Sequence, residues 1–172
     1  MADKSGQVAN GVVMDSKVRK KTLRLFSNGV YVITSCDGEH LGAATVTWIS
    51  QASFNPPLLM AAIRTDSNVF QCLVQSRVAA VHIVNTDQQA IAQKFFTPTR
   101  TEPGKINGER FQPGKTAAPI LQDLGAYVEC RVRRVIDDEG DHAMVILEVL
   151  EAECAAPMQP LTIRDSPWEY GG

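Results

Sequence analysis

Short hydroxyl side chains are concentrated in residues 42–63, which read GAATVTWISQASFNPPLLMAAI. The hydroxyl-bearing residues of this stretch are Thr45, Thr47, Ser50 and Ser53. In an extended strand the two threonines point to one face, while Val46 and Trp48 point to the other. We expect the two serines on the turn that leads to Pro56, because the alternation breaks after Ile49. Compact hydroxyls and turn N–H groups suit a phosphate or a flat heteroaromatic ring.

Arg64 stands at the end of the apolar run LLMAAI and is followed by a predicted helix, TDSNVFQCLVQS. We expect Thr65 or Asp66 to cap that helix, whose first N–H groups favour an anion. Ser67 and Asn68 would open it, so hydroxyls, an arginine and a helix start could converge on one anionic ligand. The alternative is that threonine serves here as a good strand former and that Arg64 is an ordinary surface charge. The residue types leave both interpretations open.

The other groups capable of chemistry are isolated in the sequence. His142 follows Gly140 and Asp141, and a histidine at such a position is most often a polar turn residue. None of the 3 histidines has metal-ligand spacing, and the 4 cysteines lie far apart without a CxxC pair. We therefore expect no metal site and four reduced thiols. No GxSxG sequence accompanies the serines, so they are poor candidates for a nucleophile.

Composition excludes several classes of function. A chain of 172 residues with 44% hydrophobic residues and a net charge of −2 is typical of one globular domain. There is no basic excess to attract nucleic acid or an anionic membrane. No apolar run approaches the roughly 20 residues that a membrane span needs. The first residues lack the pattern of a secretory signal, so we expect a cytoplasmic protein.

The elements that must position these residues are mostly strands. We expect an arm over residues 1–14 and one domain over residues 15–172. A helix should begin after a Ser16 cap and end at Asn28–Gly29, with Val18, Leu25 and Phe26 on its apolar face. Strands are expected at 30–36, 41–49, 58–63, 78–84, 126–136 and 142–154, the third buried on both faces.

Turn signals connect these strands into hairpins. Asp37–Gly38 is a strong hairpin turn. Short helices are expected after residue 65 and after residue 86, and residues 97–119 are expected to form a long loop. The sequence lacks the strand–helix alternation of a Rossmann fold. We therefore predict a mainly β protein, an antiparallel barrel with peripheral helices.

Three motifs in this order resemble the flavin reductase-like family with an FMN-binding split barrel. The first is VYVITS-x-DG followed by LGAATVTWISQASFNPPLLMAAI and Ser67. The second is QQAIAQKF, and the third is Gly140–Asp141–His142 at the start of a strand. The resemblance covers roughly residues 20–165. It implies an antiparallel, Greek-key-like split β-barrel that acts as a homodimer. The tail WEYGG is similar to the tails of some members.

The resemblance also implies roles for individual residues. It places FMN, with FAD as the alternative, against the residues Thr45, Val46, Thr47, Trp48, Ser50, Ser53, Ala62, Ile63, Arg64, Ser67, Asn68, Lys94 and Phe95. His142 would lie near the nicotinamide and orient it. At two places the sequence departs from the family pattern, and both concern residues on the side of the substrate. The strand before QQAIAQKF reads His82–Ile83–Val84 where the family usually has V-N-V, and Gly108–Phe111 lies later than the family's equivalent.

The activity that the resemblance implies is hydride transfer from NADH or NADPH to flavin. Reduced flavin or its electrons would then pass to a partner, such as a monooxygenase. One alternative is an electron-transfer flavoprotein resembling flavoredoxin, with tightly bound FMN and little direct NAD(P)H activity. Another is a split-barrel module that binds flavin or haem without turnover. The preference between NADH and NADPH is left open, because no Rossmann-type ribose-binding acid is present.

Overall fold

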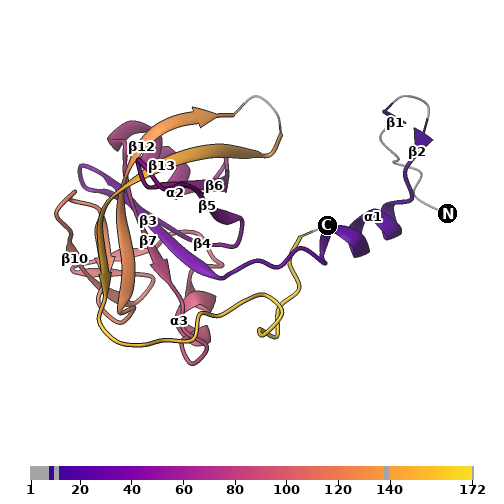
Figure 1. Ribbon diagram of the computed structural model, residues 1–172. Coiled ribbons are helices and arrows are strands. Elements are labelled where there is room, and N and C mark those ends of the chain that lie inside the picture. Colours follow the sequence, from indigo (N-terminus) through magenta and orange to yellow (C-terminus); the bar gives the residue numbers. More distant parts are fainter. Residues whose placement is uncertain (1–7, 10–11, 138–139, 172) are drawn as a thin grey trace.

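A seven-stranded antiparallel sheet forms the body of the protein (Figure 1). The computed structural model describes residues 8–9, 12–137 and 140–171. The strands, in the order in which they pair, are β4 (His40–Val46), β3 (Tyr31–Asp37), β7 (Val78–Ile83), β12 (Ala126–Ile136), β13 (His142–Cys154), β6 (Leu58–Arg64) and β5 (Ile49–Ser53). The two edge strands, β4 and β5, do not pair with each other. The sheet is therefore not closed as the predicted barrel.

A link of two residues joins the two edge strands across this opening. Thr47 and Trp48 join the last residue of β4 to the first residue of β5, so consecutive strands form opposite edges of one sheet. The predicted strand over 41–49 is thus two strands. Ser50 and Ser53 belong to β5, which pairs with β6, and are not in a turn as predicted. The turn comes after Ser53.

Local signals explain the strands that were predicted well. β3 and β4 form a hairpin in which Asp37 pairs with His40, and Gly38 takes the positive φ of 60° that the turn requires. β12 and β13 have the predicted bounds and pair from Ala126–Cys154 to Ile136–Met144. β6 is the exception. Its residues alternate between buried and exposed, so it is not buried on both faces as predicted.

The core lies inside the curved sheet and under one helix. The helix α2 (Asn68–Ser76) inserts Val69, Phe70 and Leu73 among the buried residues of the strands. Its N-cap is Ser67, not Thr65 or Asp66 as predicted, because the Ser67 hydroxyl accepts a hydrogen bond from the Phe70 N–H. The short helix α3 (Gln89–Lys94) contributes Ala92 to a second cluster of buried residues.

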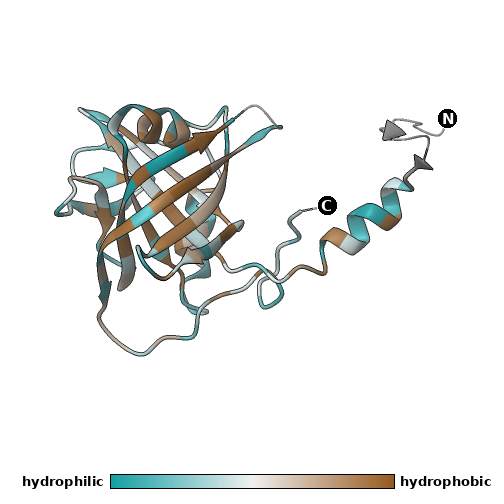
Figure 2. Cartoon of the chain, turned by 45° about the horizontal axis from the view of Figure 1, so that its top comes forward, coloured by the Kyte–Doolittle hydropathy of each residue, from teal (hydrophilic) through white to brown (hydrophobic). Residues whose placement is uncertain are grey.

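The first helix stands apart from this core. The helix α1 (Ser16–Leu23) is capped by Asp15 rather than Ser16 and ends before the predicted Asn28–Gly29. None of its residues is buried, and Leu25 and Phe26 after it are 72% and 69% exposed. Figure 2 shows α1 projecting from the body, with hydrophobic positions of this part of the chain in brown. Part of the predicted arm, residues 1–14, lies outside the described residues; within it β1 (Val8–Ala9) pairs with β2 (Val12–Val13).

The expected loop over 97–119 contains a small sheet of its own. Its strands pair in the order β11 (Pro119–Leu121), β10 (Glu109–Pro113), β9 (Lys105–Ile106) and β8 (Thr101–Glu102). Gly104, Asn107 and Gly108 have φ values of 71°, 50° and 83°, which the tight turns between these strands require. Strands of two residues are too short to show a period in sequence. Among the described residues, no helix combines the length and the hydropathy needed to cross a membrane.

Candidate functional site

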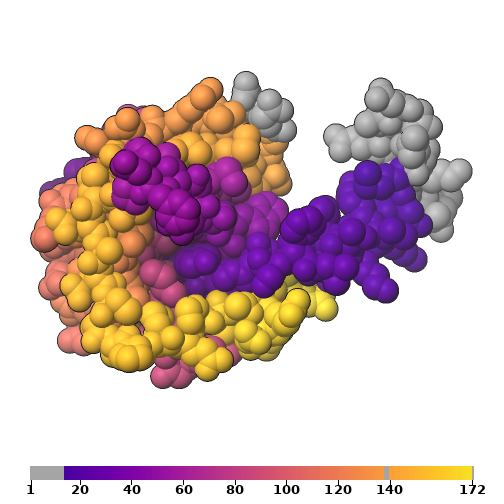
Figure 3. Space-filling model, in the orientation of Figure 1, coloured from indigo at the N-terminus to yellow at the C-terminus, as the bar shows by residue number. Residues whose placement is uncertain are grey.

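A cleft of about 680 Å³ opens between the edge strand β4, the start of α2, the segment after α3 and the C-terminal segment. A volume in this range suits a cofactor or drug-sized ligand. Figure 3 shows the C-terminal segment, in yellow, running along the body beside the indigo residues that lead into β3. The predicted site residues that line the cleft are Thr45, Thr47, Arg64, Ser67, Asn68 and Phe95.

The hydroxyls of Thr45, in β4, and of Thr47, just after β4, have different environments. Thr45 Oγ1 donates to the Ala92 carbonyl at 2.6 Å, which ties β4 to α3. Thr47 is 7% exposed, and its Oγ1 is a buried side-chain polar atom without a hydrogen-bond partner. A buried hydroxyl without a partner costs free energy unless a ligand completes it. Thr47 lines the cleft, so a ligand there would lie beside this residue.

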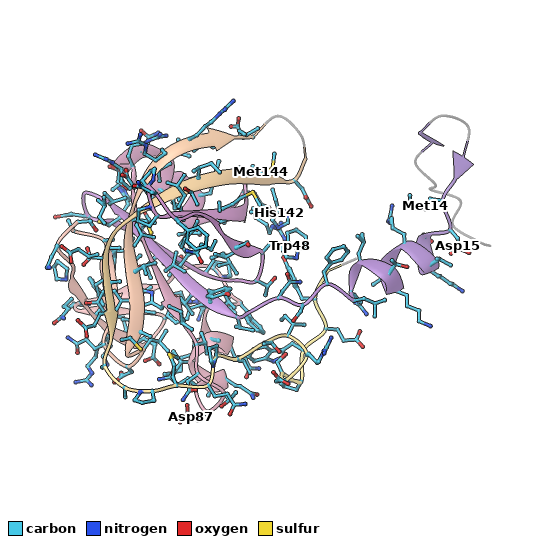
Figure 4. The ribbon with its side chains drawn as sticks, viewed as in Figure 1. Met14, Asp15, Trp48, Asp87, His142 and Met144 are labelled. Carbon is cyan, nitrogen blue, oxygen red and sulfur yellow. The ribbon has the colours of Figure 1, made fainter. Side chains whose placement is uncertain are left out.

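A narrow extension of about 70 Å³ adjoins the cleft near the opening of the sheet. It adds four of the predicted site residues and the predicted histidine, namely Val46, Trp48, Ala62, Ile63 and His142. The rings of Trp48 and His142 have centroids 4.8 Å apart. Figure 4 labels both residues, together with Met144, on the same side of the sheet. This end of the site is therefore aromatic.

His142 is held in one orientation. Its Nδ1 lies 2.8 Å from Asp141 Oδ1, and the ionised carboxylate only accepts, so Nδ1 carries the proton. The hydrogen bond from His142 lowers the pKa of the Asp141 carboxyl, which keeps that carboxylate ionised near neutral pH. The other ring nitrogen, Nε2, is then left for a ligand. Pairing in the sheet places His142 opposite Arg64, so the two predicted residues come from adjacent strands.

Arg64 and the start of α2 form the polar end of the cleft. The guanidinium of Arg64 donates to both carboxylate oxygens of Asp66, at 2.9 and 2.6 Å. This bidentate pair lowers the pKa of Asp66 and aligns the Arg64 fork. α2 begins at Asn68 with its N–H groups directed outward from the helix. An anion at this end of the cleft would meet a cation and a helix N-terminus together.

Gly42 in β4 allows α2 to approach the cleft. A Cβ at this position would lie 2.5 Å from Val69 Cα and 2.7 Å from Val69 N. Both are backbone atoms at the start of α2, so no side-chain rotation could relieve the clash. The glycine in the LGAAT sequence therefore fixes the distance between the hydroxyl-bearing strand and the helix N-terminus.

The structure leaves three predicted residues away from the cleft. Ser50 and Ser53 are on β5 and line neither the cleft nor its extension. The Lys94 ammonium pairs with Glu109, whose side chain is 8% exposed, on β10 of the small sheet. Its neighbour Phe95 is 2% exposed and does line the cleft.

Residues that sequence reasoning missed make up the opposite wall. They come from the segment after α3 and from the C-terminal segment, and include Phe96, Thr99, Trp168, Glu169 and Tyr170. Trp168 contacts Phe96 edge-on with centroids 4.8 Å apart, and Tyr170 lies 5.6 Å from Trp48. The aromatic residues in WEYGG were the available signal, but nothing local connects them to residue 48.

Other features of the described residues do not form a comparable site. They contain no group of three or more His, Cys, Asp or Glu side chains that could hold a metal. A separate hollow of about 510 Å³ lies between the β3–β4 hairpin and the small sheet. It is shallow and lacks a cationic side chain or a helix N-terminus among its lining residues. The cleft is therefore the candidate site.

Comparison with known proteins agrees with this geometry. The model of a family described as "Flavin reductase like domain" matches residues 23–167. The chain belongs to this flavin reductase-like family. The match includes every predicted site residue. The described sheet, open between β4 and β5, is therefore the form that the family's fold takes in this chain.

Individual relatives extend the comparison. The chain is 33% identical over 144 residues to a diflavin flavoprotein A 1 of Synechocystis sp., covering 83% of this chain and 25% of that protein. It is 32% identical over 122 residues to a flavin reductase (NADH) of Kitasatospora aureofaciens, covering 69% of this chain and 61% of that protein. The chain thus spans about a quarter of the first relative and under two thirds of the second.

A solved structure resembles the whole fold. BorF, the flavin reductase component of a bacterial two-component tryptophan halogenase, superposes with a TM-score of 0.69 at 26% identity. The superposition covers 83% of this chain and 89% of BorF. The likeness therefore includes nearly all of both chains, not an isolated motif.

Proposed function

We propose that the protein is a flavin reductase that binds FMN in the cleft and transfers hydride from NADH or NADPH to the flavin. The observation that carries this proposal is the Thr47 hydroxyl, buried without a partner in a cleft that also has a cation at one end. A flat ring with hydrogen-bonding edges and a phosphate would satisfy both features. Family membership supports the same ligand.

The residues present fit a flavin. Thr45, Thr47 and the backbone around Trp48 would border the ring system, and Ala62 and Ile63 would support it from β6. Arg64, Ser67 and Asn68 would hold the phosphate at the start of α2. These groups account for one phosphate, so FMN is the ligand that we propose and FAD is the alternative. When bound, the flavin supplies the hydride acceptor.

His142 would orient the hydride donor rather than move a proton. Its Nδ1–H is already committed to Asp141, and its ring packs against Trp48 at the narrow end of the cleft. Fixed in this way, the imidazole presents Nε2 and an aromatic edge to an incoming nicotinamide. Holding the donor in a reactive orientation is the contribution that such a residue can make.

The proposed partners are a second copy of the chain and an electron-accepting protein. Apolar residues of and around α1, among them Val18, Leu25 and Phe26, are more than half exposed. A second copy would cover them, which supports a homodimer. The name of BorF describes a reductase that works with a halogenase. By analogy we propose that reduced flavin or its electrons leave this protein for a monooxygenase-like acceptor, in the cytoplasm.

An anaerobic titration tests the proposal. The purified protein should bind FMN with quenching of flavin fluorescence, and NADH or NADPH should then bleach the flavin absorbance band. Both donors should be compared, because the cleft gives no reason to prefer one. A protein that ignores FMN in the titration would refute the proposal. Binding without bleaching by either donor would favour the electron-transfer flavoprotein instead.

A further inference from the structure

The C-terminal segment is attached to the body in two different ways. Around Leu161 the backbone is bonded to the core: Val30 N–H donates to the Leu161 carbonyl, and Leu161 N–H donates to the Val84 carbonyl. Leu161 itself is 0% exposed. Beyond Ser166 the described backbone makes no hydrogen bond to the backbone of the strands. Residues 166–171 instead reach the cleft through side chains.

Residues 166–171 are held over the cleft by weak contacts. Arg24, at the end of α1, pairs with Glu169 at 2.7 Å, and the Glu169 side chain is 80% exposed. Arg24 Nε also donates to the Gly171 carbonyl at 3.0 Å. Exposed ion pairs stabilise weakly and are screened by salt. Trp168 packs on the buried cluster that includes Leu161 and on Phe96, so it is the anchored end from which Glu169, Tyr170 and Gly171 can separate from the cleft.

Tyr170 is the residue of this segment that borders both the cleft and its narrow extension. Its ring contacts Trp48, which in turn contacts His142. The three rings line the narrow extension of the cleft. Tyr170 is 45% exposed and lines the cleft, so this residue contacts both solvent and the cleft.

We propose that residues 166–171 form a lid that sets how long the cleft retains its flavin, with Tyr170 closing the opening and the Arg24–Glu169 ion pair holding the lid down. The inference rests on the proposed function and deepens it. A cleft with a slowly opening lid keeps flavin as a prosthetic group. A cleft whose lid opens quickly releases reduced flavin to a partner.

The rate of FMN release measures the lid directly. It can be followed as recovery of flavin fluorescence after dilution, without turnover. Tyr170→Ala, and a chain ending at Asp165, should release FMN about tenfold faster, since both remove the aromatic contact. Glu169→Gln should accelerate release about two- to fivefold. Tyr170→Phe, which keeps the ring, and Glu153→Gln, an exposed change on β13, should behave as wild type.

Salt and tryptophan fluorescence supply independent readouts. Added salt should speed release from the wild type more than from Glu169→Gln, because the variant lacks the Arg24–Glu169 ion pair and keeps only the screening of the phosphate contact. The chain has 2 tryptophans, so Trp48→Phe leaves Trp168 as a reporter of the lid. FMN should reduce acrylamide quenching of Trp168, and Glu169→Gln should increase it.

The outcomes separate the two proposals. Unchanged release from Tyr170→Ala and from the shortened chain, with flavin still bound, would overturn the lid and leave the flavin reductase standing. If the shortened chain does not fold, Tyr170→Ala carries the same test. A wild-type chain that binds no flavin would overturn the proposed function, and the lid with it.

Discussion

Trp48 and His142 lie with ring centroids 4.8 Å apart, although 94 positions, with eight of the described strands among them, separate the two residues in the chain. Trp48 joins the edge strands β4 and β5, and His142 begins β13. β6 lies between β5 and β13 and pairs with both, so the sheet brings the two rings to one corner. This corner is where we place the reacting end of the flavin.

Replacing His142 should separate binding from reduction. His142→Ala should slow bleaching of bound flavin by NADH about 10- to 100-fold, because the donor loses its orienting contact. FMN affinity should stay nearly unchanged, since the phosphate end is intact. Stopped-flow absorbance and fluorescence titration measure the two quantities. His40→Ala, an exposed change in the β3–β4 hairpin, is the control, and loss of FMN binding in His142→Ala would show that the histidine is misplaced.

Replacing Arg64 and replacing Asp66 should change the affinity for FMN in opposite directions. Arg64→Ala should weaken FMN binding by about 1.5–3 kcal/mol, the contribution of a charge-assisted hydrogen bond. Asp66→Asn should strengthen FMN binding, because the Asp66 carboxylate accepts from Nε and Nη2 of Arg64 and repels an anion. Riboflavin, which lacks the phosphate, is the matched ligand in the same titration. Equal effects on FMN and riboflavin would contradict a phosphate contact.

Thr47→Val should have opposite effects on the free protein and on its complex. Valine has a similar shape and removes the buried hydroxyl that lacks a partner, so the free protein should gain stability by about 1 kcal/mol. The FMN complex should lose affinity, because the hydroxyl is then missing from the site. Urea unfolding with and without FMN measures both. Thr45→Val is the contrasting variant: it should destabilise the free protein, since it removes the hydrogen bond from Thr45 to the Ala92 carbonyl that ties β4 to α3.

His82 should make the stability depend on pH. It is 0% exposed, Nδ1 lies 3.0 Å from the Val32 carbonyl, and Nε2 accepts from the Leu121 N–H. Burial lowers the pKa of His82 from 6.5 to about 4. The folded protein therefore binds fewer protons than the unfolded chain between these values. The contribution of the buried, neutral His82 to the stability of the fold is fully present above pH 6.5 and is lost as the pH falls towards 4.

The size of this effect follows from the shift in pKa. A difference of about 2.5 units corresponds to roughly 3 kcal/mol of unfolding free energy lost by pH 4. Urea unfolding between pH 7.5 and 4 measures it. His82→Gln should remove most of the slope in this window whatever its absolute stability. A wild-type protein with a flat profile from pH 6.5 to 4.5 would show that His82 is not buried as a neutral ring.

The exposed apolar residues after α1 should report on self-association. The double variant Leu25→Lys and Phe26→Lys should shift the protein from dimer to monomer, because two charges would lie in the covered surface. Light scattering coupled to size-exclusion chromatography gives the mass. Gln112→Lys, an exposed change on β10, controls for added charge. A wild-type protein that is monomeric at all concentrations would contradict the homodimer.

Strands whose residues carry a local signal were predicted from sequence. β12 and β13 are long runs of 11 and 13 residues, and the turn at Gly38 requires only its own φ. The small sheet over 101–121 was missed because its strands are too short for a period to emerge. β6 was misjudged because a continuous apolar run does not tell how many of its faces are covered, which depends on neighbouring elements.

By itself the sequence determined the hairpin turn at Gly38, the bounds of β12 and β13, and the presence of a helix after Arg64. Only the tertiary structure decided that the sheet stays open between β4 and β5, and that Tyr170 lies against Trp48. The reason is physical. Alternation and turns depend on neighbours in the chain, whereas the course of the tail depends on the hydrogen bonds of Leu161 to Val30 and Val84, which no local pattern encodes.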